Sequence, residues 1–230
     1  MLTQRTVDPI ERHSAGRRDV PAAERAYSMT KELVLSGEFP GGHFLTEGVI
    51  AERLGMSRTP VREAFIRLRT EGLLQLMPRR GAVVVPVQRG EAEDVLDARE
   101  AVETAAVRRL TSRPNEIAPV LAHLRAALSL QREHAETGGL AEFVQADEVF
   151  HRAIVGAGRN TFLIDFYATL ADRQRRMSIH ALGPTMQQWP LVLCEHEKLI
   201  DIIESGDPES FASALRAHLD WAYRHLDWAY

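Results

Sequence analysis

Apolar residues in the segment 58–70 recur with the period of an α-helix and leave the rest of its surface polar. The apolar stripe contains Val61, Ala64, Phe65 and Leu68. Along its border, Arg58, Arg62 and Arg69 lie within about 40° of one another at about 100° per residue. Before this helix, Gly55 is suited to end a helix of residues 46–54, and Ser57 is suited to cap the next one. The pattern is typical of a DNA-reading helix behind a tight turn. A solvated amphipathic helix is the alternative.

A hairpin is predicted directly after this helix. Residues 73–76 and 82–87 read as two short strands, and the turn between them carries Arg79, Arg80 and Gly81. Helix, turn, helix and hairpin in this order predict a winged helix-turn-helix. Gly81 has no side chain to hold the backbone away from a sugar-phosphate wall, and Arg79 and Arg80 can reach phosphate or the minor groove. A hairpin that only faces solvent is the alternative interpretation.

After residue 90 the strand signals stop, and apolar positions keep a helical period to the end of the chain. Six helices are predicted, at residues 91–111, 115–136, 140–156, 161–181, 186–204 and 208–229, with breaks at Gly and Pro. We therefore expect a mainly α protein. A polar, disordered arm at residues 1–19 precedes an N-terminal winged helix-turn-helix domain at 20–87 and a C-terminal six-helix all-α bundle at 88–230.

Charge is divided unequally between the two predicted parts. Residues 1–87 hold 13 Lys and Arg against 10 Asp and Glu, a net +3, whereas residues 88–230 hold 15 against 22, a net −7. A basic N-terminal part joined to an acidic C-terminal part directs DNA to one part of the molecule. Cys194 is the only cysteine, which excludes an intrachain disulfide, and we expect it to fill core space in a reducing cytoplasm. No apolar run is long enough to span a membrane, so we expect a cytoplasmic protein.

One acidic residue and three histidines of the predicted bundle form a candidate metal site. Asp147 and His151 are four residues apart, so they project from one face of a helix. His196 and His218 lie near apolar positions of two later helices. Helical bundles build metal sites by converging such side chains, and one carboxylate with three imidazoles suits Zn²⁺ or Ni²⁺. Taken singly, each histidine is more often a hydrogen-bonded core residue than a ligand.

Four short runs in the N-terminal part match one family pattern. They are Gly37-Glu-Phe-Pro-Gly41, residues 54–64, residues 68–73 and Arg80-Gly81. Through them, residues 27–87 resemble the GntR family of bacterial transcription regulators. The resemblance implies operator contacts by Ser57, Arg58, Thr59, Arg62 and Gly81. One position departs from the pattern: many relatives have arginine after the glutamate that opens the second helix, where this chain has Gly48, so that contact is lost.

The C-terminal part carries a second resemblance. The Asp-x-x-x-His pattern at Asp147 and His151, the pair Glu195-His196 and the late His218 are similar to the FCD effector-binding domain of the FadR branch of this family. Six helices place the domain nearer to the branch's VanR-like group. The resemblance implies a bound metal whose open positions accept a carboxylate ligand.

The resemblance also implies a cation for an acidic effector. The family's Arg-x-x-x-Glu pattern recurs as Arg99 and Glu103, which makes Arg99 the candidate. A surface salt bridge between these two residues is an equal alternative, because pairs at this spacing commonly face solvent. Three further arginines crowd one later helix, and the sequence does not indicate which faces the pocket: Arg173, Arg175 or Arg176.

These patterns together predict a ligand-responsive bacterial transcription regulator. We expect a homodimeric repressor that leaves a palindromic operator in double-stranded DNA when a small organic acid binds beside the metal. A metal-dependent enzyme with a DNA-binding appendage is one alternative, since an open metal site can also activate water. Against it, Ile200 stands where a zincin helix beginning at His196-Glu197 needs its second histidine. A constitutive DNA binder with a structural metal is the other alternative.

Overall fold

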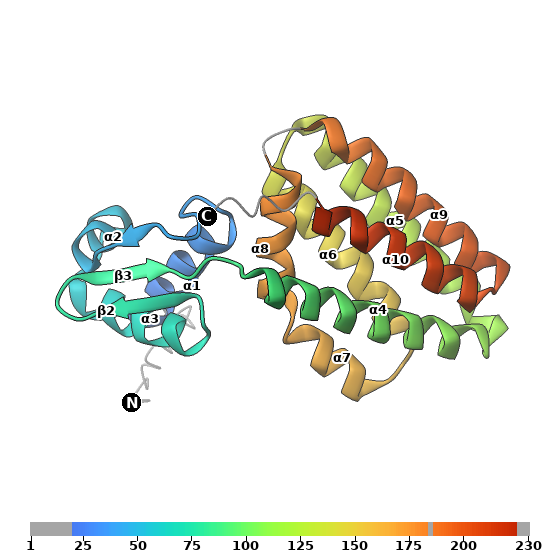
Figure 1. Ribbon diagram of the computed structural model, residues 1–230, viewed down its shortest axis with the longest axis horizontal. Coiled ribbons are helices and arrows are strands. Elements are labelled where there is room, and N and C mark those ends of the chain that lie inside the picture. Colours follow the sequence, from blue (N-terminus) through green and yellow to red (C-terminus); the bar gives the residue numbers. More distant parts are fainter. Residues whose placement is uncertain (1–19, 184–185, 225–230) are drawn as a thin grey trace, which may run out of the picture.

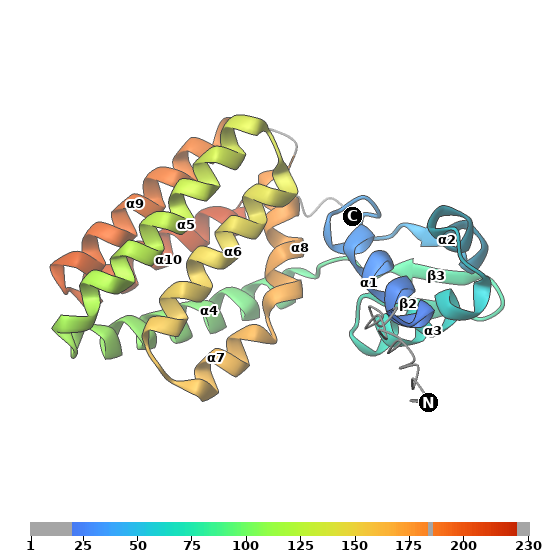
Figure 2. The same cartoon turned by 180° about the vertical axis from the view of Figure 1, so that it is seen from behind.

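The computed structural model describes residues 20–183 and 186–224, which form two parts joined by a short segment (Figure 1). We call the part from α1 to β3, residues 22–84, the reader, and the part from α4 to α10, residues 89–224, the helical body. The arm expected at residues 1–19 and the last residues of the final predicted helix lie outside the described residues. The two views in Figures 1 and 2 place α8 at the edge of the helical body that faces the reader.

The reader consists of three helices and a small sheet. Its elements are α1 (Ala22–Leu35), β1 (Phe44–Leu45), α2 (Glu47–Leu54), α3 (Arg58–Thr70), β2 (Leu74–Met77) and β3 (Gly81–Val84). The antiparallel sheet has the order β1-β3-β2, with Leu74 opposite Val84 in the hairpin. The predicted winged helix-turn-helix is thereby confirmed. The sequence pattern had not indicated α1 or β1.

The turn between α2 and α3 is built by local chemistry. Gly55 ends α2 in the left-handed conformation with φ 62°, which only glycine adopts at little cost. The Thr46 side chain caps the start of α2 by accepting a hydrogen bond from the Val49 amide at 3.2 Å. Ser57 is the N-cap residue of α3, but its side chain forms no capping hydrogen bond, so the predicted cap is wrong in this detail. The predicted apolar stripe of α3 is buried at all four positions: Val61, Ala64, Phe65 and Leu68.

The helical body contains seven α-helices among its described residues. They are α4 (Arg89–Thr111), α5 (Ile117–Thr137), α6 (Leu140–Ala157), α7 (Thr161–Ala168), α8 (Ala171–Leu182), α9 (Trp189–Ser205) and α10 (Pro208–Arg224), with short 3₁₀ turns at Pro114–Glu116 and Met186–Gln188. Leu124, Phe150, Ile154 and Phe211 belong to a core shared by these helices, each at most 1% exposed. Along residues 20–183 and 186–224, no helix is both long and apolar enough to cross a membrane.

The expected helix at residues 161–181 is instead two helices, which changes the count from six to seven. The break lies at Thr169 and Leu170, whose amides bond to the carbonyls three residues back, of Phe166 and Tyr167. The Thr169 hydroxyl also donates to the Phe166 carbonyl at 2.6 Å and competes for that acceptor. Neither Gly nor Pro marks the break, so the apolar periodicity predicted one continuous helix across it. The resemblance to the VanR-like group rested on six helices, and the seven helices of the body do not support it.

Cys194 is exposed on α9, so the prediction that it fills core space is wrong. Val192 and His196, two residues to either side, take the buried positions of this helix. A residue two positions away points roughly to the opposite side of a helix, which leaves Cys194 at the surface.

Candidate DNA interface and metal centre

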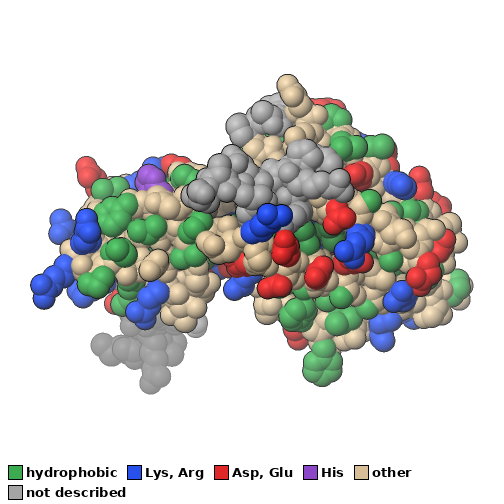
Figure 3. Space-filling view, in the orientation of Figure 1, with side chains coloured by type: hydrophobic (Ala, Val, Ile, Leu, Met, Phe, Trp, Pro, Cys, Tyr) green, Lys and Arg blue, Asp and Glu red, His purple; other side chains and the backbone are tan. Residues whose placement is uncertain are grey.

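The arginines predicted to read DNA surround a concave surface between α3 and the wing. This surface encloses about 680 Å³, and its lining includes Arg58, Arg62, Arg69, Arg79, Arg80 and Gly81. Ser57 and Thr59, at the start of α3, are also exposed. Figure 3 shows Lys and Arg side chains gathered at the end of the reader far from the helical body. The surface combines cationic side chains with the exposed first turn of a helix, as phosphate and base contacts require.

Gly81 shapes the wing through its backbone as well as through its size. Its φ of 142° is a conformation that L side chains rarely adopt. A Cβ at this position would lie 2.1 Å from the Leu45 carbonyl oxygen, because β1 crosses directly beside it. Arg79, in the same turn, is itself left-handed with φ 61°. The wing tip therefore depends on glycine for folding, in addition to the close approach to DNA that the sequence suggested.

The four predicted metal-site residues meet inside the helical body. Asp147 and His151 come from α6, His196 from α9 and His218 from α10, and all four are buried. One candidate ligand atom from each lies within 4.8 Å of the others. A carboxylate and three imidazoles at such separations have the donor set and the spread that a divalent ion such as Zn²⁺ needs.

Each histidine of the cluster is held through its Nδ1 atom by a neighbouring side chain. Nδ1 of His151 lies 2.7 Å from a Glu103 oxygen, that of His196 lies 2.8 Å from Gln131 Oε1, and that of His218 lies 2.8 Å from a Glu195 oxygen; the three cluster histidines share this arrangement. A proton on Nδ1 leaves Nε2 as the acceptor.

Among the described residues, the Nε2 atoms of His151 and His196 are buried without a hydrogen-bond partner, and that of His196 lies 3.4 Å from an oxygen of Asp147 in the same cluster. Burial lowers the pKa of His151 and lowers that of His196 well below its usual range, so both imidazoles are neutral near pH 7. An unpartnered, neutral Nε2 with Nδ1 held by a second group is the arrangement of a metal-binding histidine. The residues present therefore fit a divalent metal.

Glu103 connects this cluster to Arg99. One Glu103 oxygen faces His151, and the other accepts hydrogen bonds from the Tyr167 hydroxyl at 2.7 Å and from Arg99 Nε at 3.1 Å. Burial acts to raise the pKa of the Glu103 carboxyl, but His151, Arg99 and these hydrogen bonds bring it down to about 2. Glu103 is 0% exposed and Arg99 is 6% exposed, so the alternative of a surface salt bridge is wrong.

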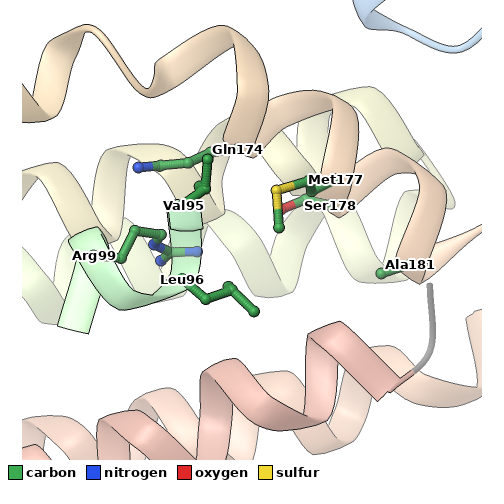
Figure 4. A pocket seen from close by; sticks show the side chains of 7 residues that line it. All are labelled: Val95, Leu96, Arg99, Gln174, Met177, Ser178 and Ala181. Atoms are coloured by element: carbon green, nitrogen blue, oxygen red, sulfur yellow. The ribbon is translucent and has the colours of Figure 1, made fainter. Parts of the chain in front are cut away.

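A small cavity lies between α4 and α8, next to Arg99 (Figure 4). Its volume of about 10 Å³ holds a single water molecule. Two of its lining residues present buried donors that have no hydrogen-bond partner in the part of the chain that the structure describes, Nη2 of Arg99 and Nε2 of Gln174. Donors of this kind fit the oxygens of an acid.

None of the three crowded arginines of α8 lines this cavity. Arg173 pairs with Glu91 at 2.9 Å, Arg175 pairs with Glu32, and Arg176 bonds the Val85 carbonyl. The residues of α8 that line the cavity are Gln174, Met177, Ser178 and Ala181.

Comparison with known proteins assigns both parts. Residues 22–84 match the model described as bacterial regulatory proteins, gntR family, and residues 94–220 match the FCD domain, more than half of the chain. An HTH-type transcriptional regulator in an unstable DNA locus of Streptomyces ambofaciens is 32% identical over 208 residues, which cover 88% of this chain and 81% of that protein. The chain belongs to the GntR family. It is of the FCD type, as the two resemblances implied.

Two further known proteins are similar to this chain, one in sequence and one in fold. The HTH-type transcriptional repressor RspR of Escherichia coli is 27% identical over 202 residues, covering 86% of each chain. The structure of a putative GntR regulator from Rhodococcus sp. RHA1 has the same fold, with a TM-score of 0.73 over 90% of this chain and 98% of that one, at 22% identity. The GntR and FCD matches make this protein a DNA-binding transcriptional regulator and not an enzyme.

The residues that hold the cluster histidines were missed by sequence reasoning. Glu103 and Glu195 both stand in the predicted motifs, one as the possible partner of Arg99 and the other directly before His196, but neither was predicted to hold a histidine. Gln131 and Tyr167 belong to helices away from any motif, and no local pattern distinguishes them. Their roles follow from the packing of α4, α5, α6 and α7 around the GntR-family regulator's buried cluster.

Proposed function

We propose that this GntR-family regulator is a homodimeric repressor whose operator affinity is lowered when a small organic acid binds beside a metal. The observation that carries the proposal is the buried cluster of Asp147, His151, His196 and His218. Glu103 links this cluster to Arg99, a cation that has a buried donor without a partner among the described residues. In this proposal residues 20–87 read DNA, and residues 88–230 hold the effector and the second copy.

The cationic concave surface of the reader supports the assignment of the residues that contact DNA. We assign the contacts to Ser57, Arg58, Thr59, Arg62, Arg79, Arg80 and Gly81, all on α3, its N-cap or the wing. Arg62 is 73% exposed and its contact to Glu47 is long, at 3.9 Å, so its guanidinium is available to a base edge or a phosphate.

Arg62→Ala tests this surface. It should weaken operator binding by about 1–3 kcal/mol without lowering the melting temperature, because most of the Arg62 side chain is exposed to solvent. Arg125→Ala, which removes the same charge from the surface of α5, is the control and should leave operator affinity unchanged. Operator binding that Arg62→Ala leaves intact in a fluorescence titration would remove Arg62 from the DNA contacts.

The metal cluster supports an acidic effector. A divalent ion at this site supplies positive charge and coordination positions that a carboxylate can take. Asp147 contributes the only carboxylate of the four proposed ligands, so positive charge remains on a bound ion. Arg99, which is bonded to Glu103, and Gln174, which lines the same small cavity as Arg99, have buried donors that would bind further oxygens of the acid.

Removal of one proposed ligand tests the metal site. His151→Ala should lower both metal content and thermal stability, because it removes one of four ligands and leaves Glu103 without one of its three partners. His123→Ala, at an exposed histidine of α5, is the control. Metal analysis after loading with Zn²⁺ or Ni²⁺ gives the first readout and calorimetry the second. A metal that stays bound while no carboxylic acid binds would instead support the alternative of a structural ion.

A further inference from the structure

Both walls of the cavity beside Arg99 are attached to the reader, by different means. Val95, Leu96 and Arg99 come from α4, and Gln174, Met177, Ser178 and Ala181 come from α8 (Figure 4). The N-terminus of α4 follows β3 after four residues, so the backbone connects this wall to the wing. The second wall, α8, is far from the reader in sequence and is attached to it by side chains.

Among the described residues, two ion pairs join α8 to the reader, and one hydrogen bond joins it to the segment that connects the reader to the helical body. Lys31 Nζ of α1 lies 2.6 Å from Asp172, and Glu32 of α1 accepts a hydrogen bond of 3.0 Å from Arg175. Arg176 donates to the Val85 carbonyl just after β3. Gly37, at the end of α1, packs against Ile179: a Cβ there would come within 2.9 Å of the Ile179 side chain. Figure 2 shows α8 beside α1.

The first of these contacts, between Lys31 and Asp172, is connected through Lys31 to α3, the predicted DNA-reading helix. Lys31 Nζ also lies 3.1 Å from Glu71, which ends α3, and the Tyr27 hydroxyl donates to the same carboxylate at 2.7 Å. The Lys31 and Asp172 side chains are 21% and 34% exposed, so water screens the pair only partly. A displacement of α8 therefore acts on α1 and, through Lys31, on the end of α3.

We propose that the ion pairs of Asp172 and Arg175 with the reader form a latch, which an acid entering between α4 and α8 opens. A cavity of about 10 Å³ cannot hold an organic acid unless its walls separate. Because both walls are attached to one reader, separating them strains one attachment, and the ion pairs yield before the backbone does. The closed cavity belongs to the latched form that binds the operator.

The latch predicts opposite changes in the affinities for the two ligands, the operator and the acid. A protein without the latch should bind the operator more weakly and the acid more tightly, since the acid no longer has to break the ion pairs. A contact that only stabilised the fold would not tighten acid binding. This inference rests on the proposed acid site, so the two must be tested separately.

The test uses full-length, Zn²⁺-loaded protein with Asp172→Asn and Arg175→Gln combined, which spares Lys31 and its contact to α3. Arg125→Gln combined with Glu204→Gln is the matched control, because it also removes one positive and one negative charge, from an ion pair between α5 and α9, and neither helix lines the cavity. Operator affinity is measured by fluorescence titration and succinate binding by calorimetry. We expect the double variant to bind operator about fivefold more weakly and succinate about fivefold more tightly than wild type, and the control to match wild type.

Each outcome decides between the two ideas. Weaker operator binding with unchanged succinate affinity would overturn the latch, and so would an operator affinity equal to that of wild type. If succinate binds no form of the protein, the proposed acid site fails, and the operator titration alone decides whether α8 holds the reader in its DNA-binding orientation.

Discussion

Glu103 carries more interactions than any single role requires. Its two oxygens face His151, Tyr167 and Arg99. One carboxylate therefore orients a proposed metal ligand and also neutralises Arg99, the cation proposed to bind the acidic effector. The position is 0% exposed, and a charge buried this deeply is tolerated only when its partners are in place. The proposed metal site and the proposed effector site therefore share one charged side chain.

Glu103→Gln tests this link, because it keeps the volume and removes the charge. The variant should bind the metal about 10–100-fold more weakly, as is typical when a group that orients a metal-bound histidine is changed. Competition against a chromophoric chelator measures this affinity. Glu100→Gln is the control: it is one turn away on α4 and pairs with Arg216 outside the cluster. An equal metal affinity for wild type and Glu103→Gln would show that Glu103 only balances the charge of Arg99.

The four proposed metal ligands were predictable from the sequence, whereas their neighbours were not. Asp147 and His151 share a helix face by simple periodicity, and His196 and His218 each lie on an apolar face. The partner of His196 is Gln131, which lies 65 positions earlier in the chain. Its assignment needs the packing of α5 against α9, and no local pattern contains that information.

Among the elements, the wing shows where one residue decides whether a hairpin can form. Gly81 pairs with Met77 across the hairpin and lies against the Leu45 carbonyl of β1, so any side chain meets backbone that cannot move aside. The sequence showed that a glycine was there and suggested a reason in DNA contact. The closeness of β1 depends on a two-residue strand that alternation cannot detect.

Two Gly→Ala substitutions should change stability in opposite directions. Gly81→Ala should destabilise the reader by more than about 1 kcal/mol, because φ is positive and the added Cβ collides with Leu45. Gly90→Ala, in the first turn of α4 with no atoms within 4 Å of the added Cβ, should stabilise the protein by roughly 0.5–1 kcal/mol. Chemical denaturation followed by circular dichroism measures both. A Gly81→Ala protein as stable as wild type would refute the backbone argument.

Helix periodicity located the helices of the body but not the break at Thr169. That break separates α7 from α8 and lets α8 turn toward the reader, where it meets α1 and the segment after β3. The signal for the break is a hydroxyl that bonds backward to a carbonyl, a weak preference shared by many residues that remain helical. The helix that carries the proposed latch, α8, was therefore hidden inside a longer predicted helix.

For the whole molecule, the proposed function requires a fixed distance between two readers. Each chain presents a single α3, and two such helices reach successive major grooves of a palindrome only when they are about 34 Å apart. The short connection of residues 85–88 allows little slack between a reader and its helical body. A dimer joined through the helical bodies would then set the separation of the readers.

Light scattering on the full chain should accordingly give twice the mass of one 25.8 kDa chain at micromolar concentration. Operator selected from random DNA should read as an inverted repeat, and inserting five base pairs at its centre should weaken binding by at least about tenfold, since this turns the half-sites to opposite faces of the duplex. Replacing the same central base pairs without changing their number is the control. A monomer in solution whose operator affinity is unchanged by the insertion would show that one reader binds DNA alone. That result would refute the dimeric repressor, but it would not bear on the metal cluster or on Arg99.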